Sequence, residues 1–187
     1  MSEPLLQAEE LSAGYQGPVV GPVSFSVSAG EVVVLSGPNG CGKSTLLGAV
    51  LGHSRVFSGS LRRSSRASLA CLGQQAGLPE ELPMTGRELV TLAEGDPAVL
   101  PEYLGAVLHQ RVDRLSGGQR QLMHVWAAIA GSARLLLLDE PTNNLDPVSE
   151  SLLADYLCGP LGERGVLLVC HEPDFVARVA DRVIEVR

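Results

Sequence analysis

Residues 31–51 read EVVVLSGPNGCGKSTLLGAVL, and this stretch decides the fold. The run at 31–36 is rich in β-branched residues, which is typical of a strand that is buried on both faces of a sheet. The glycines of 37–42 follow it, and the pattern of 43–51 then predicts a helix. A strand, a glycine-rich turn and a helix in this order are typical of α/β folds.

The turn itself matches the pattern G-x-x-x-x-G-K-[S/T] at residues 37–44. Its glycines let the backbone curl so that successive N–H groups face an anion, and the helix N-terminus adds positive partial charge. We expect Lys43 to reach the β- and γ-phosphates of a nucleotide and Ser44 to bind Mg²⁺. The alternative is an ordinary glycine-rich turn, which the demanding G-K-S-T sequence at a strand–helix junction disfavours.

Further apolar runs alternate with helical patterns along the rest of the chain. Strands are expected at 5–11, 23–27, 67–72, 134–139, 165–170 and 182–186. Helices are expected at 85–94, 98–110, 116–130, 148–157 and 174–180. Continuous apolar strands that alternate with helices predict an α/β fold with a parallel sheet covered on both faces.

Polar residues stand where three of the predicted strands end, at Ser36, at Asp139-Glu140 and at His171. Ligands of such sheets bind at the C-terminal ends of the strands, so these residues are expected at one edge. Asp139 is placed to hold Mg²⁺ through water, and Glu140 is a candidate general base for an attacking water. Alone, an apolar run that ends in two acids is more often an ordinary strand end, but the phosphate loop earlier in the chain favours the catalytic interpretation.

The segment LSGGQ at 115–119 opens the predicted helix at 116–130. Ser116 is a suitable N-cap, because its side-chain oxygen can accept a backbone N–H of the first turn. A capped, glycine-rich helix start is a second candidate anion site. In isolation, the same segment could be a capping motif without further function.

The composition limits the classes of protein that fit. The chain has 187 residues, which suits one domain with a sizeable core. Hydrophobic residues make up 45% and charged residues 19%, so a disordered chain is excluded. The net charge of −7 counts against a protein that binds the phosphate backbone of nucleic acids. Arg62, Arg63 and Arg66 form the one basic cluster, which we interpret as a solvated hairpin.

The remaining sequence signals point to a reduced protein without a membrane span of its own. The four cysteines form no C-x-x-C pair, so their spacing predicts neither a zinc site nor a disulfide framework. The first ten residues do not have the pattern of a signal peptide. The longest apolar runs are far shorter than the ~18 residues that would cross a membrane. We therefore expect a cytoplasmic chain that works at a membrane only as a peripheral subunit.

Together, GPNGCGKST at 37–45, LSGGQ at 115–119, LLLLDEP at 135–141, the following NNLD and His171 resemble the nucleotide-binding subunit of an ABC transporter. The resemblance covers roughly residues 5–186. It implies a P-loop NTPase fold, with a mostly parallel sheet core, an N-terminal antiparallel β region and a short helical subdomain. One ATPase domain over 1–187 is expected, with the helical subdomain shortened to about 76–114.

The resemblance also implies how ATP is bound. Tyr15 matches the aromatic residue that stacks on adenine; the alternative is a partly buried loop tyrosine. The phosphates would be held by Gly37, Pro38, Asn39, Gly40, Cys41, Gly42, Lys43, Ser44 and Thr45. The implied ligands of Mg²⁺ are Ser44, Gln74 and Asp139. The implied catalytic residues are Glu140, His171 as the switch residue near the γ-phosphate, and Gln74 as the sensor of Mg²⁺ or water. Gln75 is adjacent, so the last assignment could shift by one position.

Two such domains would pack head to tail, with two ATP molecules between the phosphate loop of one and LSGGQ of the other. The residues implied to contact the partner's ATP are Ser116, Gly117, Gly118 and Gln119. Asp146 would lie in the loop that crosses the dimer interface. The segment after Gln74 would touch the membrane subunit.

The expected function is therefore ATP binding and hydrolysis by an ABC transporter subunit that drives solute transport through a separate permease. The expected partners are a second ATPase subunit, the permease and an extracytoplasmic substrate-binding protein, with no nucleic acid. The subunit would lie on the inner face of the cell membrane. Residues 59–75 and 78–92 more loosely resemble the metal importers of the family, for zinc or manganese. The alternative is an ABC-type ATPase that acts on nucleic acid or the ribosome.

Overall fold

The structure is a computed structural model that describes residues 3–72 and 83–187. Its centre is a five-stranded sheet in the order β5-β6-β7-β3-β8, with every neighbouring pair parallel. The strands are β3 (Val32–Ser36), β5 (Leu69–Leu72), β6 (Leu135–Asp139), β7 (Gly165–Val169) and β8 (Arg182–Glu185). The predicted α/β fold with a parallel sheet is thereby confirmed.

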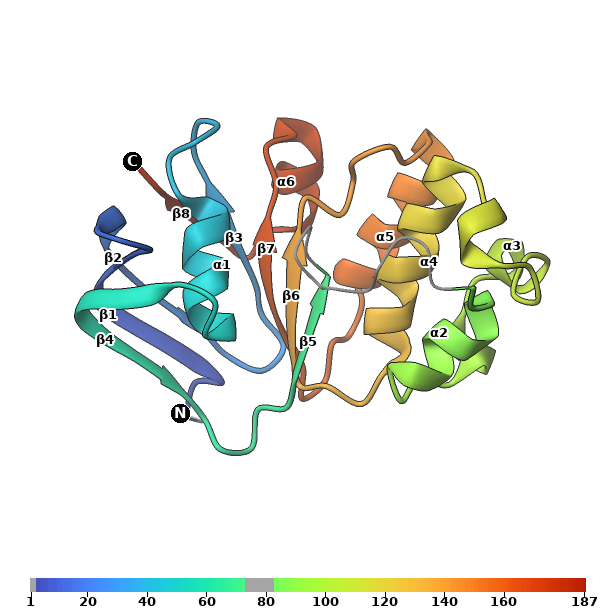
Figure 1. Cartoon of the computed structure of the whole chain (residues 1–187), viewed down its shortest axis with the longest axis horizontal. Helices are drawn as coiled ribbons and strands as arrows, with labels where there is room; N and C mark the ends of the chain where they lie inside the picture. Colours follow the sequence, from blue (N-terminus) through green and yellow to red (C-terminus); the bar gives the residue numbers. More distant parts are fainter. Residues whose placement is uncertain (1–2, 73–82) are drawn as a thin grey trace.

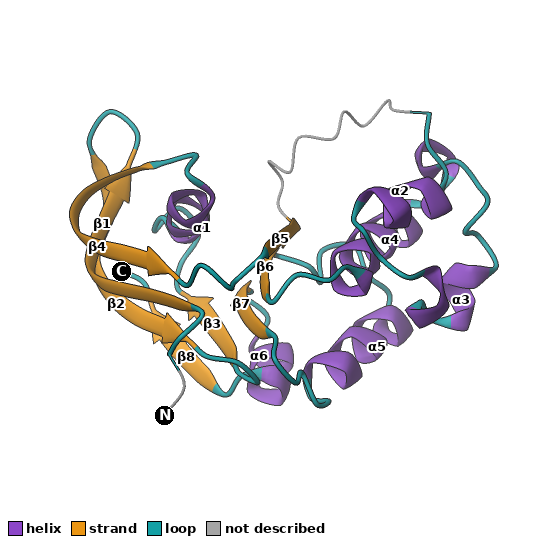
Figure 2. Cartoon of the chain, turned by 90° about the horizontal axis from the view of Figure 1, so that it is seen from below, coloured by secondary structure: helices purple, strands orange, loops and turns teal. Residues whose placement is uncertain are grey.

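The parallel sheet separates two hydrophobic cores, which explains why its strands are apolar throughout. Alternate residues of β6 face opposite ways: Leu135 and Leu137 belong to one core, whereas Leu136 and Leu138 belong to the other. Figure 2 shows a three-stranded sheet and α1 (Lys43–Leu51) on one side of the parallel sheet, and most of the helices on the other. Burial on both faces removes the polar–apolar alternation that a half-exposed strand would show.

The helices on the second side follow the predicted segments, with one exception (Figure 1). They are α2 (Gly86–Leu92), α3 (Glu102–Gly105), α4 (Gly117–Ala130), α5 (Pro147–Leu157) and α6 (Pro173–Val179), with 3₁₀ turns η1 (Pro97–Val99) and η2 (Val112–Arg114). The helix predicted at 98–110 is wrong, because this stretch contains only η1, an extended Leu100 and the single turn of α3. Pro101 explains the break, since proline disfavours the helical conformation of the residue before it and donates no backbone hydrogen bond.

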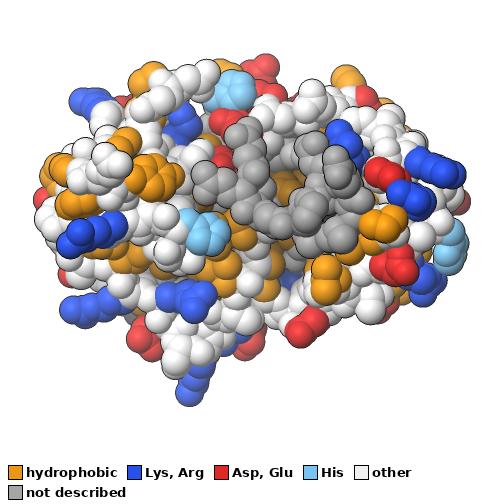
Figure 3. Space-filling view, viewed as in Figure 1, with side chains coloured by type: hydrophobic (Ala, Val, Ile, Leu, Met, Phe, Trp, Pro, Cys, Tyr) orange, Lys and Arg blue, Asp and Glu red, His pale blue; other side chains and the backbone are white. Residues whose placement is uncertain are grey.

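A second, antiparallel sheet has the order β2-β1-β4 and consists of β1 (Leu6–Gly14), β2 (Pro18–Val27) and β4 (Arg55–Arg63). Strands β1 and β2 correspond to the two short strands predicted near the N-terminus. The hairpin predicted around Arg62 and Arg63 is wrong, because both residues lie on β4, which pairs with the distant β1, but their predicted exposure to solvent is confirmed. Figure 3 shows Lys and Arg side chains gathered over this strand, at the lower left of the face in view. Most of β4 is exposed, so it has no apolar alternation, and only its distant pairing partner reveals it.

Candidate functional site

The glycine-rich loop lies between the end of β3 and the start of α1, where the sequence places it. Gly40 and Gly42 have φ angles of 82° and 99°, in the left-handed region that favours glycine. Gly42 is the N-cap of α1, and no side chain of the described residues caps this helix. The first N–H groups of α1 are therefore available to an anion.

Strand β2 closes one side of this loop. A Cβ atom on Gly42 would lie 2.5 Å from the Cβ of Val20 and could not be accommodated without a shift. Gly42 is thus required both for its backbone angle and for the close approach of β2. The neighbouring Val19 is exposed and lines the same opening as the loop.

Lys43 is 6% exposed and folds back over its own loop. Its ammonium group donates to the carbonyl oxygens of Gly37 at 2.8 Å and of Pro38 at 2.9 Å. An ammonium has three donors, so these two bonds leave one for a bound anion, with the Cys41 sulfur as a weak partner at 3.9 Å. The loop therefore presents a buried positive charge beside the free end of α1.

An opening of about 390 Å³ brings the loop together with the ends of β6 and β7. Its lining residues are Val19, Asn39, Gly40, Gly42, Lys43, Ser44, Thr45, Glu140, Asn143 and His171. Eight of these ten residues were expected from the sequence as ATP-binding or catalytic residues; the other two are Val19 and Asn143. The parallel sheet explains the gathering, because the carboxyl ends of β3, β6 and β7 meet at one edge.

Asp139 and Ser44 form a donor set that suits Mg²⁺. The Ser44 hydroxyl donates to a carboxylate oxygen of Asp139 at 3.4 Å. Burial raises the pKa of Asp139, and the nearby Glu140 carboxylate raises it further, although Ser44 and Lys43 act in the opposite direction. A buried carboxylate beside a hydroxyl offers hard oxygen ligands that Mg²⁺ prefers, and a cation there would offset the cost of burying the charge.

Glu140 and His171 form a direct pair across the sheet edge. The His171 Nδ1 and the Glu140 Oε2 lie 2.7 Å apart, with the Glu140 side chain 15% exposed and the His171 side chain 49% exposed. The backbone of Glu140 has a φ of 49°, which is uncommon for a residue with a side chain, and its N–H donates to the Val169 carbonyl at 2.9 Å. A left-handed backbone conformation at a residue with a side chain costs free energy and persists only where the surrounding structure enforces it, and such residues are common at functional sites.

The LSGGQ segment lies elsewhere, since none of Ser116, Gly117, Gly118 and Gln119 lines the opening. Ser116 caps α4 reciprocally: its hydroxyl accepts the Gln119 N–H at 3.2 Å, and the Gln119 side chain accepts the Ser116 N–H at 3.1 Å. Ser116 and Gly117 are exposed. The helix start is therefore formed and accessible, although it does not face the phosphate loop of its own chain.

Asp146 caps the neighbouring helix α5 by accepting the N–H groups of Val148 and Ser149, both at 3.0 Å. The residues before it lie beside the LSGGQ segment, because a Cβ atom on Gly118 would be 2.8 Å from the Asn144 carbonyl oxygen. Tyr15 is 53% exposed and does not line the opening. Gln74 lies outside the described residues.

Val19 and Asn143 are the lining residues without an assignment from sequence. Asn143 follows the two acids of the strand end closely, so its distance from them along the chain was a usable signal. Val19 carries no such signal, because only the packing of β2 against the loop brings it to the opening.

The described residues offer no other metal centre, since they contain no group of three or more His, Cys, Asp or Glu side chains able to hold an ion. Residues 3–72 and 83–187 likewise contain no helix that is long and apolar enough to span a membrane.

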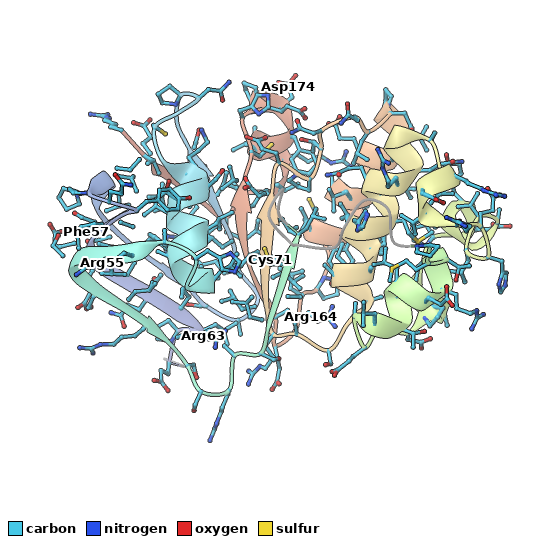
Figure 4. All side chains as sticks on the ribbon, viewed as in Figure 1. Arg55, Phe57, Arg63, Cys71, Arg164 and Asp174 are labelled. Atoms are coloured by element: carbon cyan, nitrogen blue, oxygen red, sulfur yellow. The ribbon has the colours of Figure 1, made fainter. Side chains whose placement is uncertain are left out.

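Cys71 offers a test of the electrostatics around Asp139 (Figure 4). Burial raises the pKa of the Cys71 thiol to about 11, and the Asp139 carboxylate contributes to the shift. Alkylation needs the thiolate, so at pH 8 the reactive fraction should be about 100-fold smaller than for a thiol with a pKa near 9. We expect iodoacetamide labelling of Cys71, followed by peptide mass spectrometry, to rise only near pH 10 or above.

The exposed Cys158 serves as the control within the same chain. Asp139→Asn should move the Cys71 profile to lower pH, because it removes a neighbouring negative charge. Labelling of Cys71 as fast as that of Cys158 at pH 8 would contradict the raised pKa.

The comparisons with known proteins all match ABC transporters or their ATP-binding subunits. Residues 20–143 match the family model described as "ABC transporter". The chain is 39% identical to a zinc import ATP-binding protein of Magnetococcus marinus, with 98% of this chain and 74% of that protein aligned. It is 31% identical to a phosphonates import ATP-binding protein of Hyphomonas neptunium, covering 98% of this chain and 84% of that protein. A solved ATP-binding subunit of an ABC transporter superposes with a TM-score of 0.84 at 27% identity, covering 98% of this chain and 86% of that chain.

Proposed function

Because the chain belongs to the ABC transporter family and is an ATPase of that family, we propose that it powers the import of a metal ion through a separate membrane permease. One observation carries the proposal: Lys43, Ser44, Glu140 and His171 line one opening, beside the Asp139 carboxylate. The proposal extends to one ATPase domain over 1–187, with a short helical subdomain at about 76–114. Zinc or manganese is the proposed cargo, which the similarity to zinc import proteins supports.

In the proposed mechanism, the phosphates of ATP lie across the free N–H groups at the start of α1, and Lys43 donates to the β- and γ-phosphates. Tyr15 stacks on the adenine. Ser44 and Asp139 would hold Mg²⁺, with Gln74 as a further proposed ligand. Bound there, Mg²⁺ would neutralise charge that develops on the phosphates.

Glu140 accepts a proton from the attacking water while the water oxygen bonds to the γ-phosphorus. The bond from that phosphorus to the bridging oxygen breaks, and ADP leaves with that oxygen. His171, 2.7 Å from Glu140, keeps this carboxylate oriented and contacts the γ-phosphate. The two residues stand at the ends of adjacent strands, β6 and β7, so the sheet fixes their separation.

The second half of each site comes from another copy of the chain. Ser116, Gly117, Gly118 and Gln119 do not line the opening of their own chain, yet they form an accessible helix start. We propose that they bind the γ-phosphate of ATP held by the partner copy, with Asp146 at the interface between the two. Closure of the dimer on ATP and its opening after hydrolysis then drive the permease. A ligand can close the dimer only if it binds the closed state more tightly than the open state, and in this proposal ATP does so whereas the products of hydrolysis do not.

We further propose that the subunit sits on the inner face of the cell membrane through its permease, with an extracytoplasmic substrate-binding protein as the third component. An ATPase that acts on nucleic acid is disfavoured by the net charge of −7.

The experiment is co-purification of this chain with a candidate membrane permease produced in the same cells, followed by reconstitution in lipid vesicles. We expect the complex to hydrolyse ATP and to be stimulated when its substrate-binding protein carries Zn²⁺ or Mn²⁺. Phosphonate serves as the control cargo, since a phosphonates import protein is also similar. Stimulation by phosphonate alone would overturn the metal assignment, and the absence of any stable permease complex would overturn the transport role.

A further inference from the structure

The C-terminal end of α4 depends on partners from other parts of the chain. The cap residue Gly131 is extended, with φ −69° and ψ 174°, and the last turn contains no basic residue. The carbonyl groups of the last turn have no partner within the helix and must find one elsewhere. The Asp96 N–H supplies one such bond, to the Ala130 oxygen at 3.2 Å.

Arg164 supplies two more bonds from the turn that precedes β7. Its guanidinium donates to the Ile129 carbonyl at 2.5 Å and to the Gly131 carbonyl. In Figure 4 its label lies between the lower end of the parallel sheet and α4. A positive charge at a helix C-terminus also interacts favourably with the helix dipole. Arg164 therefore caps α4 from outside the helix.

The same guanidinium reaches the neighbouring helix α5. Its Nη1 donates to the Tyr156 hydroxyl at 3.0 Å. The Tyr156 ring packs edge-on against Trp126 of α4, with ring centroids 5.5 Å apart and planes at 69°. Trp126 is buried, and its Nε1 has no hydrogen-bond partner among the described residues, so packing alone holds this ring. Arg164 and Tyr156 thus fasten α4 to α5.

The opposite ends of the two helices also meet. Gly118, in the first turn of α4, lies against the Asn144 carbonyl just before α5. Ser116 caps α4 at this end, and Asp146 caps α5. The two helices are therefore joined at both ends, and the residues that the proposed function assigns to the partner's ATP all lie at one of them.

We propose that Arg164 is a positioning residue for the face that completes the partner's ATP site. It fixes the C-terminal end of α4 against α5, so that Ser116 and Asp146 present a single rigid surface. Without it, α4 can tilt about its N-terminal contacts, which changes the direction in which the N–H groups of its first turn face the partner's γ-phosphate. The role rests on the proposed ATP-bound dimer. It does not involve the opening that holds ATP in the same chain, which Arg164 does not line.

The test compares Arg164→Ala with the wild type in two measurements. ATP affinity, measured by titration with a fluorescent ATP analogue on dilute protein, should stay within twofold, because that site is formed by other residues. The ATPase rate per molecule should depend on protein concentration, and the concentration for half-maximal rate should rise at least fivefold in Arg164→Ala. Arg164→Lys should restore part of the shift, since an ammonium can reach one carbonyl but cannot span two carbonyls and the Tyr156 hydroxyl.

Leu6→Val is the control for a general loss of stability. Leu6 is fully buried in the antiparallel sheet, and the hydrophobic core to which it belongs contains no buried residue of α4 or α5. If Arg164→Ala shifts the half-maximal concentration no more than Leu6→Val does, Arg164 is only a stabilising residue and the proposal is wrong. Where Arg164→Ala does not fold, Tyr156→Phe carries the same test, with a smaller expected shift of at least twofold. If the wild-type ATPase rate per molecule does not depend on protein concentration, the proposed dimer and this role of Arg164 are both wrong. If the wild-type rate does depend on concentration but the variants show no shift, only the role of Arg164 is wrong.

Discussion

Glu140→Gln is expected to lower the rate of ATP hydrolysis by about 100-fold or more, while ATP still binds. The amide of glutamine has nearly the shape of the carboxylate but cannot accept the proton of the attacking water. The phosphate-binding groups, Lys43 and the N–H groups at the start of α1, are unchanged. ATP should therefore remain bound, and the ATP-bound dimer should accumulate.

Two measurements check this expectation. Phosphate release in a single turnover reports the chemical step, and size-exclusion chromatography with Mg²⁺ and ATP reports the dimer. Glu172→Gln is the matched control, because Glu172 immediately follows His171 but does not line the opening. It removes the same charge nearby and should leave hydrolysis within about twofold. A Glu140→Gln protein that hydrolyses ATP at the wild-type rate would show that Glu140 is not the base.

Lys43→Ala is expected to weaken ATP binding by roughly 10- to 100-fold, as the loss of a charged hydrogen bond worth about 1.5–3 kcal/mol implies. The ammonium is buried and already fixed by the Gly37 and Pro38 carbonyls, so little order is lost when phosphate binds. Alanine also leaves these two carbonyls without their donor. ATP hydrolysis should fall along with affinity.

Isothermal titration with ATP, together with thermal unfolding of the same sample, separates lost binding from lost folding. Arg55→Ala is the charge-matched control, since Arg55 is exposed on β4 and stacks over the Phe57 ring, away from the opening. It should leave ATP affinity within about twofold if the contact of Lys43, rather than the general field of positive charges, holds the phosphates. Equal affinities of Lys43→Ala and the wild type would refute the assignment.

Local patterns of the sequence were sufficient for most elements of the fold. The run at β3 and the loop before α1 could be predicted because strand burial, turn and helix start are encoded within about twenty neighbouring residues. Strand β4 and the break near Pro101 were missed for different reasons. Strand β4 is mostly exposed and is defined by pairing with β1, whereas the break arises because Pro101 holds Leu100 extended within a stretch that otherwise has a helical pattern.

The candidate site also contains both residues that the sequence could predict and residues that only the packing brings together. The phosphate loop and the acids at the end of β6 could be named from the residue pattern, because each is a contiguous segment, whereas the switch role of His171 came from the resemblance to ABC transporter subunits. The contribution of Val19 could not be named from the sequence, since it follows from the close approach of β2 to Gly42. The roles of the motif residues in hydrolysis stay predictions that the variants above test.

By itself, the sequence determined the alternation of buried strands and helices, the phosphate loop and the capped start of α4, because each depends on side chains that are close along the chain. Only the tertiary structure decided the strand order β5-β6-β7-β3-β8, which brings His171 within 2.7 Å of Glu140 although 31 positions separate them. It also decided that Arg164 caps α4, a helix whose last turn lies 33 to 35 positions away along the chain. The physical reason is that local periodicity records which face of an element is buried, whereas the choice of neighbour depends on how all the buried faces pack together.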